Sequence, residues 1–348
     1  MEQPGSTKKT RVRYFMLALV FVNVVINYLD RSNLSVAAAG LGGDLQLTPF
    51  QLGLVFSAFG WTYAALQIPG GLVADRITPR VLYTLCLCAW SLATVAQGFA
   101  KGFGSLFAFR LATGAFEAPS YPINNRIVTS WFPEHERASA IALYVAGQFI
   151  GLAFLTPVLV APQVYAGWRG VFIVTGCIGL LWGAIWYIFY RDPLDDRRVN
   201  QAELEYIEKG GGVYKKVITA HKHSAWRKED WKQVFSSRTL WGIYIAQFCV
   251  NATLWFFLTW FPTYLVKYRG LSFLKTGFLA SIPFLSACAG LLLSGFLSDY
   301  LIRKGRSIGM ARKTPIIFGL LLSGSIVGAN YTDDTALVIF FMSLPFFV

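Results

Sequence analysis

Long apolar runs dominate this chain, and short polar segments separate them. A helix that crosses the hydrocarbon core of a bilayer needs about 20 mostly apolar residues. Nine runs are long enough, and each predicts a membrane-spanning helix: residues 14–40, 51–73, 81–100, 104–129, 137–160, 167–190, 239–265, 274–300 and 313–330. A tenth run begins near Thr335. The pattern therefore predicts an all-α membrane protein.

One long polar segment, residues 191–238, lies between the sixth and the seventh predicted span. Inside it, Asn200 and the acidic residues after it predict a capped amphipathic helix, which ends at the glycine run beginning with Gly210. We interpret residues 191–238 as a cytoplasmic linker. It separates a six-span lobe, residues 1–190, from a second lobe, residues 239–348, which contains three spans and the start of another.

A five-residue pattern occurs twice in the chain, at matching places in the two halves. Gly71 and Asp75 come at the end of the second span, and Gly295 and Asp299 come at the end of the eighth. Glycine lets helices approach closely, and aspartate can cap a neighbouring helix or pair with nearby basic residues. Parallel repeats of this kind predict a two-lobed transporter whose site lies between the lobes, near the middle of the membrane.

The composition supports a membrane protein and excludes other classes. Hydrophobic residues make up 55% of the chain and charged residues only 14%, whereas a soluble protein has about 25% charged residues. The net charge is +13, but most of the 31 Lys and Arg face the cytoplasm if the N-terminus lies there. The basic excess therefore predicts orientation in the cell inner (plasma) membrane, with a cytoplasmic N-terminus, and not nucleic-acid binding.

Ionisable side chains within the predicted spans are candidate functional groups, because burial in lipid makes them unfavourable without a role. In the first span, Asn23, Asn27, Asp30 and Arg31 follow one stripe of the helix. Such a stripe must face a polar cavity or other helices. The alternative is a packing network in which Asp30 and Arg31 neutralise each other or their neighbours.

The fourth predicted span carries a second pair, Arg110 and Glu117. The two positions are seven apart in the sequence, which corresponds to about 10 Å along a helix. We therefore expect each side chain to have a partner on another helix. Pro119 and Pro122 predict a kink directly after Glu117. A glutamate whose charge depends on a nearby cation suits a proton carrier. The alternative is a fixed ion pair of Arg110 with Asp30 or Glu117.

No motif indicates an enzyme, a metal site or a bound cofactor. The chain lacks the phosphate-binding loop G-x-x-x-x-G-K-[ST], which makes ATP-driven transport an unfavoured explanation. All three histidines fall in predicted inner loops, and Cys86-x-Cys88 has no second cysteine pair. These observations disfavour a membrane-embedded enzyme, which is the alternative class.

Several motifs resemble those of known transporters. The loop after the second span resembles the signature loop of the major facilitator superfamily at Gly71, Asp75, Arg76 and Arg80, and it departs from that loop at Thr78 and Pro79. Five further stretches resemble the anion:cation symporter family within it, and most of all its sugar-acid branch: residues 27–33, 67–71, 114–119, 131–137 and 255–262.

This resemblance implies a two-lobed helical bundle and proton-coupled symport of a sugar-acid anion. D-galactonate is the first expectation, with glucarate, galactarate or a hexuronate as alternatives. The implied partners are the small organic anion, protons and membrane lipid, and the implied state is a monomer without cofactors. By the resemblance, substrate binding falls to Arg31, Tyr28, Tyr63, Gln148 and Gln247. Proton coupling falls to Asp30, Arg110 and Glu117.

Similar transporters have twelve spans, whereas this chain is expected to have nine and the start of a tenth. The alternative function is therefore a truncated product that inserts into the membrane without transporting.

Overall fold

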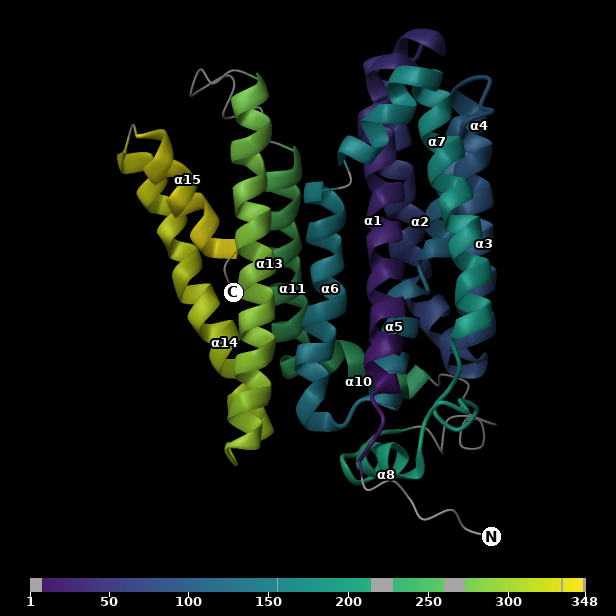
Figure 1. Cartoon of the computed structure of the whole chain (residues 1–348). Helices are drawn as coiled ribbons and strands as arrows, with labels where there is room; N and C mark the ends of the chain where they lie inside the picture. The colour runs from purple at the N-terminus through teal and green to yellow at the C-terminus, as the bar shows by residue number, and fades with distance from the viewer. Residues whose placement is uncertain (1–7, 155, 214–227, 260–272, 333, 347–348) are drawn as a thin grey trace. The chain divides into compact units, whose positions relative to one another are not determined.

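The computed structural model describes residues 8–154, 156–213, 228–259, 273–332 and 334–346, and these residues form helices without any strand. The α-helices are α1 (Val12–Asp44), α2 (Pro49–Arg76), α3 (Pro79–Gln97), α4 (Phe103–Glu117), α5 (Ser120–Trp131), α6 (Arg137–Phe154), α7 (Thr156–Phe189), α8 (Gln201–Lys209), α10 (Lys228–Ser236), α11 (Arg238–Thr259), α13 (Phe273–Arg303), α14 (Ile308–Ser323) and α15 (Thr335–Ser343) (Figure 1). Short 3-10 turns are η1 (Glu134–Glu136), η2 (Gly324–Tyr331) and η3 (Leu344–Phe346).

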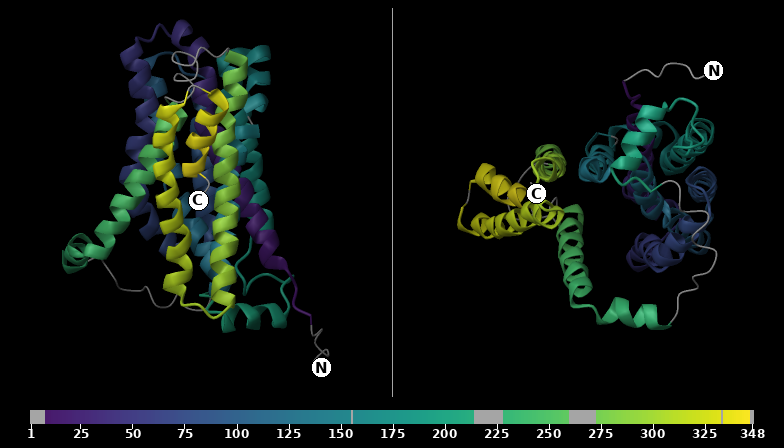
Figure 2. Two further views of the ribbon diagram at one scale, coloured as in Figure 1. Left: turned by 90° about the vertical axis from the view of Figure 1, so that its left-hand side faces the viewer. Right: turned by 90° about the horizontal axis from the view of Figure 1, so that it is seen from below.

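The chain divides into two units. The first comprises residues 1–217 and 291–315, and the second comprises residues 218–290 and 316–348. The described part of the first unit holds α1 to α8, and in the second unit η2 lies beside α15 (Figure 2). The predicted lobes, which end and begin on either side of the polar linker, stay a prediction.

Five helices in the described residues are long and apolar enough to cross a membrane: Val12–Ala38, Pro79–Gln97, Tyr165–Phe189, Ile282–Arg303 and Ile308–Tyr331. The other predicted spans coincide with α2, with α4 and α5 together, with α6 and with α11. Their role as spans stays a prediction. The all-helical fold itself agrees with the prediction from the apolar runs.

Local sequence explains where the helices begin and break. Thr48 and Gln51 form a reciprocal cap at the start of α2, where each side chain bonds the backbone of the other. The predicted kink after Glu117 is present, because α4 ends there and α5 begins at Ser120. Gly167 has a φ of +63° and interrupts α7, which fits the predicted start of a span at that residue.

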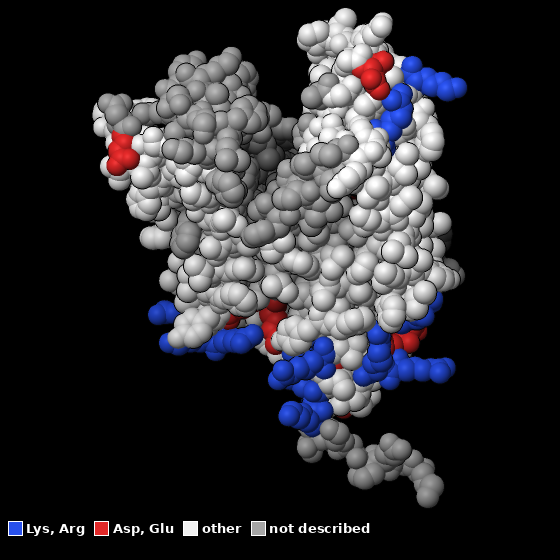
Figure 3. Space-filling view, turned by 45° about the horizontal axis from the view of Figure 1, so that its top comes forward, with Lys and Arg blue, Asp and Glu red and all other residues white. Residues whose placement is uncertain are grey.

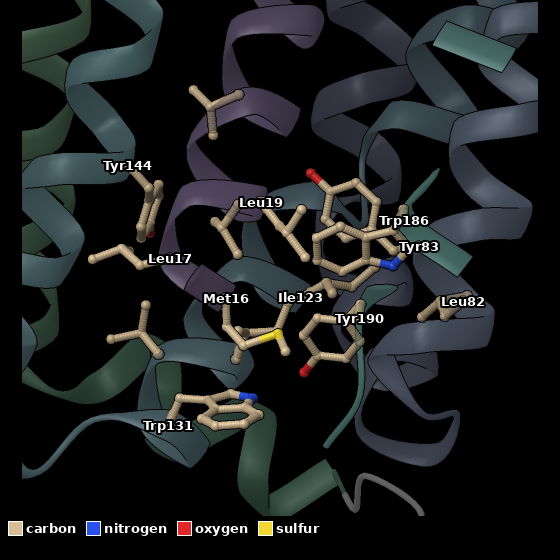
Figure 4. Packing of buried hydrophobic residues seen from close by; sticks show 14 of the residues in the cluster. Met16, Leu17, Leu19, Leu82, Tyr83, Ile123, Trp131, Tyr144, Trp186 and Tyr190 are labelled. Carbon is tan, nitrogen blue, oxygen red and sulfur yellow. The ribbon is translucent and has the colours of Figure 1, made fainter. Parts of the chain in front are cut away.

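The core of the first unit lies between α1, α3, α5, α6 and α7. Three tryptophans, Trp90, Trp131 and Trp186, are fully buried in it. The ring of Trp186 lies between those of Tyr83 and Tyr190, with centroid distances of 4.8 and 4.5 Å (Figure 4). Aromatic packing of this kind holds α3 and α7 together in the part of the unit that surrounds the candidate site.

Candidate functional site

Four charged side chains gather in the interior of the first unit, and we call them the core cluster: Asp30, Arg31, Arg110 and Glu117. α1 carries the first two and α4 carries the others. Asp30, Arg110 and Glu117 have 1%, 4% and 0% of their surface exposed. A charged side chain buried to this extent must have an ion-pair partner or hydrogen bonds, or it must adopt its uncharged protonation state.

Arg31 and Glu117 form an ion pair between α1 and α4. Nε and Nη2 of Arg31 lie 2.8 and 2.7 Å from the same oxygen, Oε1 of Glu117. The second oxygen, Oε2, is buried and accepts no hydrogen bond from the described residues. The glutamate therefore has one bonded oxygen and one free oxygen.

Aromatic rings surround the Arg31 guanidinium. Its central carbon lies 4.6 Å from the ring centroid of Tyr28, 4.7 Å from that of Tyr63 and 5.1 Å from that of Phe59. Ring faces attract a cation and leave its N–H edge available for hydrogen bonds. Sequence analysis singled out both tyrosines and missed Phe59, because an apolar ring in an apolar span carries no signal of its own.

A small residue on α4 explains why Phe59 lies so close. A Cβ atom at Gly114 would lie 2.3 Å from the carbonyl oxygen of Phe59, and 2.5 Å from the hydroxyl of Thr62. Only glycine permits this approach of α2 to α4. Thr62 also donates a hydrogen bond of 2.8 Å to the carbonyl of Leu111 across the same contact. Gly114 belongs to the motif at residues 114–119. The sequence therefore marked this glycine, but it did not indicate that the glycine allows α2 and α4 to pack closely.

Asp30 has a different set of neighbours. Its Oδ2 accepts a hydrogen bond of 3.2 Å from the indole of Trp90 on α3. Its Oδ1 accepts none from the described residues, although Thr175 of α7 lies near. Asp30 and Arg31 do not form an ion pair with each other in this structure. The alternative in which these two residues neutralise each other in a packing network therefore does not apply here. Trp90 was missed by sequence analysis for the same reason as Phe59.

Arg110 is buried beside both carboxylates without a direct ion pair to either in the described residues. Its Nη1 lies 3.5 Å from the backbone oxygen of Asp30, and its guanidinium lies 5.2 Å from the ring of Phe59. Its Nε has no partner among the described residues. The alternative of a fixed ion pair of Arg110 with Asp30 or Glu117 therefore does not describe this structure.

The remaining predicted substrate residues lie in different places. Gln148 of α6 is half-buried, and its side-chain oxygen accepts a hydrogen bond of 3.3 Å from Tyr121 of α5. Tyr121, which sequence analysis missed, interacts electrostatically with Tyr28 and Arg31 and so connects Gln148 to the core cluster. Gln247 is exposed on α11, in the second unit. Its participation stays a prediction.

The signature loop lies at the end of α2. Asp75 and Arg76 are exposed there, whereas Arg80 donates a hydrogen bond of 3.0 Å to the carbonyl of Tyr187 and stacks on its ring. Gly71 faces Pro122 of α5.

The repeat of this pattern behaves differently. Asp299 is 2% exposed, and its Oδ2 accepts a hydrogen bond of 2.7 Å from the backbone N–H of Ser139, in the first turn of α6. A carboxylate at that position caps the helix, which is one of the two roles predicted for the aspartate of this pattern.

A second buried charged group lies where α8 packs against the start of α1, and we call it the end cluster: Arg13, Glu136, Glu203 and Tyr206. Arg13 lies 3.1 Å from Glu136 and 2.9 Å from Glu203. Tyr206 donates a hydrogen bond of 2.6 Å to the other oxygen of Glu136. The predicted cap of α8 is present, with Asn200 accepting from the N–H of Glu203.

The end cluster also shows how hydrogen bonds offset burial. Burial alone would raise the pKa of Glu136, but the hydrogen bond from Tyr206 and the charge of Arg13 outweigh it, so its pKa lies below the usual value. Burial, with the hydrogen bond to Glu136, raises the pKa of Tyr206 to about 12.

The described residues contain no group of three or more His, Cys, Asp and Glu side chains placed to hold a metal ion.

Comparison with known proteins decides the family. The profile of the Major Facilitator Superfamily matches residues 20–348. The chain belongs to the Major Facilitator Superfamily. Membership agrees with the predicted fold class and with the expectation that the protein is a transporter and not an enzyme.

Relatives within this superfamily are similar over nearly the whole chain. A D-galactonate transporter of Escherichia coli O6:H1 (strain CFT073) is 51% identical over 345 residues, which cover 99% of this chain and 80% of that protein. A probable galactarate/D-glucarate transporter of Bacillus subtilis (strain 168) is 44% identical over 348 residues, which cover 98% of this chain and 76% of that one.

Solved structures support the same fold. A bacterial homologue of the human lysosomal transporter Spinster, in an inward-facing and unoccupied conformation, superposes with a TM-score of 0.60 at 21% identity. The match covers 99% of this chain and 73% of that chain.

Proposed function

We propose that this member of the superfamily carries a sugar-acid anion across the inner membrane together with protons, with D-galactonate as the first candidate substrate. The transport names of relatives at 44% and 51% identity support the substrate class. The observation that carries the coupling is the Arg31 ion pair, in which a cation enclosed by aromatic rings is neutralised by one oxygen of a buried glutamate.

Arg31 is the proposed site for the substrate carboxylate. A guanidinium binds a carboxylate through two parallel hydrogen bonds, and it keeps its positive charge at any physiological pH. Its Nε and Nη2 edge is the edge that Glu117 occupies. Substrate and Glu117 therefore compete for the same donors, while Tyr28 and Tyr63 hold the cation from its faces.

Protonation decides that competition. A glutamate that loses Arg31 to the substrate would be a buried unpaired anion, which is strongly unfavourable, unless it takes up a proton. The free oxygen, Oε2 of Glu117, is available for that proton. Binding of the substrate anion and protonation of Glu117 are thus linked, which is the basic requirement of a proton symporter.

Asp30 and Arg110 complete the proposed coupling set. Asp30, like Glu117, has one bonded and one free oxygen, so it too can accept a proton without breaking its hydrogen bond from Trp90. Arg110 supplies positive charge beside both carboxylates, and among the residues that the structure describes its one hydrogen bond goes to a backbone oxygen. It therefore stabilises whichever carboxylate is charged. Gln148, with Tyr121 next to it, is the proposed partner of the substrate hydroxyl groups.

The test is uptake of radiolabelled D-galactonate into proteoliposomes that contain the purified chain. With an inward pH gradient we expect accumulation above the external concentration, and with a proton ionophore we expect only equilibration. Unlabelled glucarate, galactarate and hexuronates compete in parallel samples and rank the substrates. Accumulation that the ionophore leaves unchanged would contradict proton coupling, and competition by none of these sugar acids would contradict the substrate class.

We also propose a monomer with a cytoplasmic N-terminus and with lobes at residues 1–190 and 239–348. Lys and Arg side chains gather at the lower end of the view in Figure 3, which supports this orientation. Single cysteines placed at exposed positions of this end and labelled from one side of intact cells test the orientation. Labelling from the outside would reverse it.

A further inference from the structure

Beyond the carboxylates of the core cluster, several buried polar atoms of the first unit have no hydrogen-bond partner among the described residues. They are Nδ2 of Asn23, both side-chain atoms of Asn27 and of Asn124, the hydroxyl of Tyr83, and Nε1 of Trp186. Every one of these residues is 0% exposed. An unsatisfied buried polar group destabilises a fold. Native proteins satisfy such groups with ordered water, which binds where several polar atoms converge.

Tyr83 lies beside two other members of this group, Asn124 and Trp186. Its hydroxyl interacts electrostatically with Ser120, Asn124 and Glu117, yet no described residue makes a well-formed hydrogen bond to it. Ser120 donates a hydrogen bond of 2.6 Å to the backbone oxygen of Glu117. The ring of Tyr83 lies 6.1 Å from that of Trp90, the hydrogen-bond donor to Asp30. Tyr83 is therefore adjacent to the immediate neighbours of both buried carboxylates.

The same group continues toward the end of the unit that carries α8. From Tyr83 the stacked rings of Trp186 and Tyr190 lead along α7 (Figure 4). Tyr190 donates a hydrogen bond of 3.1 Å to Asp192, which is half-exposed just after the end of α7. Arg126 is the cation near Asp192. On α1, Asn27 and Asn23 follow the same direction from Asp30, one helical turn at a time.

We propose that these polar atoms hold a chain of water molecules, which transfers protons between the core-cluster carboxylates and the α8 end of the first unit. This inference rests on the proposed proton symport. A proton leaves Oε2 of Glu117, and each water molecule or hydroxyl on the route accepts one proton as it gives one up. Tyr83 is unchanged after each transfer. The charged groups along the route are Glu117, Asp30, Arg31 and Arg110 at one end and Asp192, Asp195 and Arg126 at the other.

The variant Tyr83→Phe tests the route, because it removes the hydroxyl and keeps the ring between Trp90 and Trp186. Two rates are measured in proteoliposomes: D-galactonate uptake driven by a pH gradient, and exchange of labelled for unlabelled D-galactonate at equal pH on both sides. Exchange does not require proton release. We expect driven uptake to fall at least about tenfold, equivalent to about 1.4 kcal/mol in the barrier, and exchange to stay within about twofold.

Asn124→Leu is the second variant, since it removes both unsatisfied amide atoms at similar volume, and it should give the same split between the two rates. Tyr144→Phe is the matched control. Tyr144 is also a buried tyrosine of this unit, but its hydroxyl donates directly to Asn125 at 2.9 Å. We expect driven uptake and exchange in this control to remain in the wild-type ratio.

The outcomes separate the two proposals. Wild-type uptake that ignores the pH gradient would overturn the proposed symport and this route with it. Gradient-driven uptake in the wild type, with a normal rate in Tyr83→Phe and Asn124→Leu, would overturn the route alone. An equal loss of driven uptake and exchange in both variants would also overturn it, because that result means a role in folding or substrate binding.

Discussion

The two buried charge clusters of the first unit differ in how completely their hydrogen bonds are satisfied. In the end cluster both oxygens of Glu136 and both oxygens of Glu203 are bonded, the latter also by Thr10 and by the N–H of Val12. In the core cluster Glu117 and Asp30 each have one oxygen with a hydrogen bond and one without a partner in the described part of the chain. A saturated network fixes one arrangement, whereas an unsaturated one can accept a proton or exchange a partner.

We infer from this difference that the charges of the end cluster stabilise the fold, whereas those of the core cluster can change protonation or partner during transport. Removal of one partner from a saturated buried pair leaves an uncompensated charge and destabilises the fold. Neutralisation of a carboxylate whose second oxygen is already free costs less stability, but it removes the change of state on which coupling depends. Substitutions in the two clusters should therefore separate stability from transport.

The largest effect is expected for Glu117→Gln. Glutamine resembles the protonated side chain but cannot release a proton, so gradient-driven accumulation of D-galactonate should be abolished while exchange at equal pH persists. Both are measured in proteoliposomes. The amide oxygen of glutamine can still accept a hydrogen bond from Arg31, and the rings of Tyr28 and Tyr63 still attract its charge, so the unfolding temperature should fall only slightly. Accumulation against a substrate gradient by this variant would remove Glu117 from the coupling set.

Arg31→Lys should reduce transport strongly without unfolding the protein. Lysine keeps a positive charge but loses the planar pair of donors. A hydrogen bond to a charged group contributes about 1.5–3 kcal/mol, so the apparent affinity for D-galactonate should fall by roughly 10- to 150-fold. The measurement is the concentration dependence of initial uptake. Near-normal affinity would place the substrate carboxylate elsewhere.

Glu203→Gln tests the saturated cluster. It leaves Arg13, whose side chain is 3% exposed, without one of its two carboxylates. The oxygens of Glu203 accept hydrogen bonds from Thr10, Val12 and Arg13, and a hydrogen bond to a charged group contributes about 1.5–3 kcal/mol. The unfolding temperature in detergent should therefore fall clearly, while the folded fraction transports normally. Glu205→Gln is the matched control on the same helix, because its pair with Lys209 is exposed and contributes at most about 1 kcal/mol. Equal effects of the two variants would contradict the structural role of the end cluster.

The smallest effect concerns acid stability. Because the fold holds the pKa of Glu136 below its usual value, the unfolded chain takes up this proton first as the pH falls. The contribution of Glu136 is therefore complete at neutral pH and declines as the pH falls from about 5 toward its folded pKa. Tyr206→Phe removes one hydrogen bond to Glu136 and should move this decline to higher pH. Unfolding temperatures of the wild type and of Tyr206→Phe, measured between neutral and acidic pH, check these two expectations. An identical pH profile in the variant would contradict the role of Tyr206 in lowering the pKa of Glu136.

Sequence reasoning reached the charged members of the core cluster but not their contacts. Asp30, Arg31 and Glu117 stand out because lipid-buried charge is rare, and the kink after Glu117 follows from its prolines. Phe59 and Trp90 did not stand out, because aromatic residues are common in spans and become informative only once the packing of helices is known. Arg13 did not stand out among the basic residues near the N-terminus, because its burial depends on α8, whose Glu203 binds it.

The break between α4 and α5 has a mechanical consequence. Pro119 and Pro122 lack the N–H groups that would continue the helical hydrogen bonds, so bending resistance is lowest directly after Glu117. Beyond the break, Arg126 of α5 donates hydrogen bonds to the backbone oxygens of Ala74 and Ile77 at the end of α2. We expect a change of charge on Glu117 to alter the angle between α4 and α5. Because Arg126 binds the end of α2, movement of α5 would then move the signature loop.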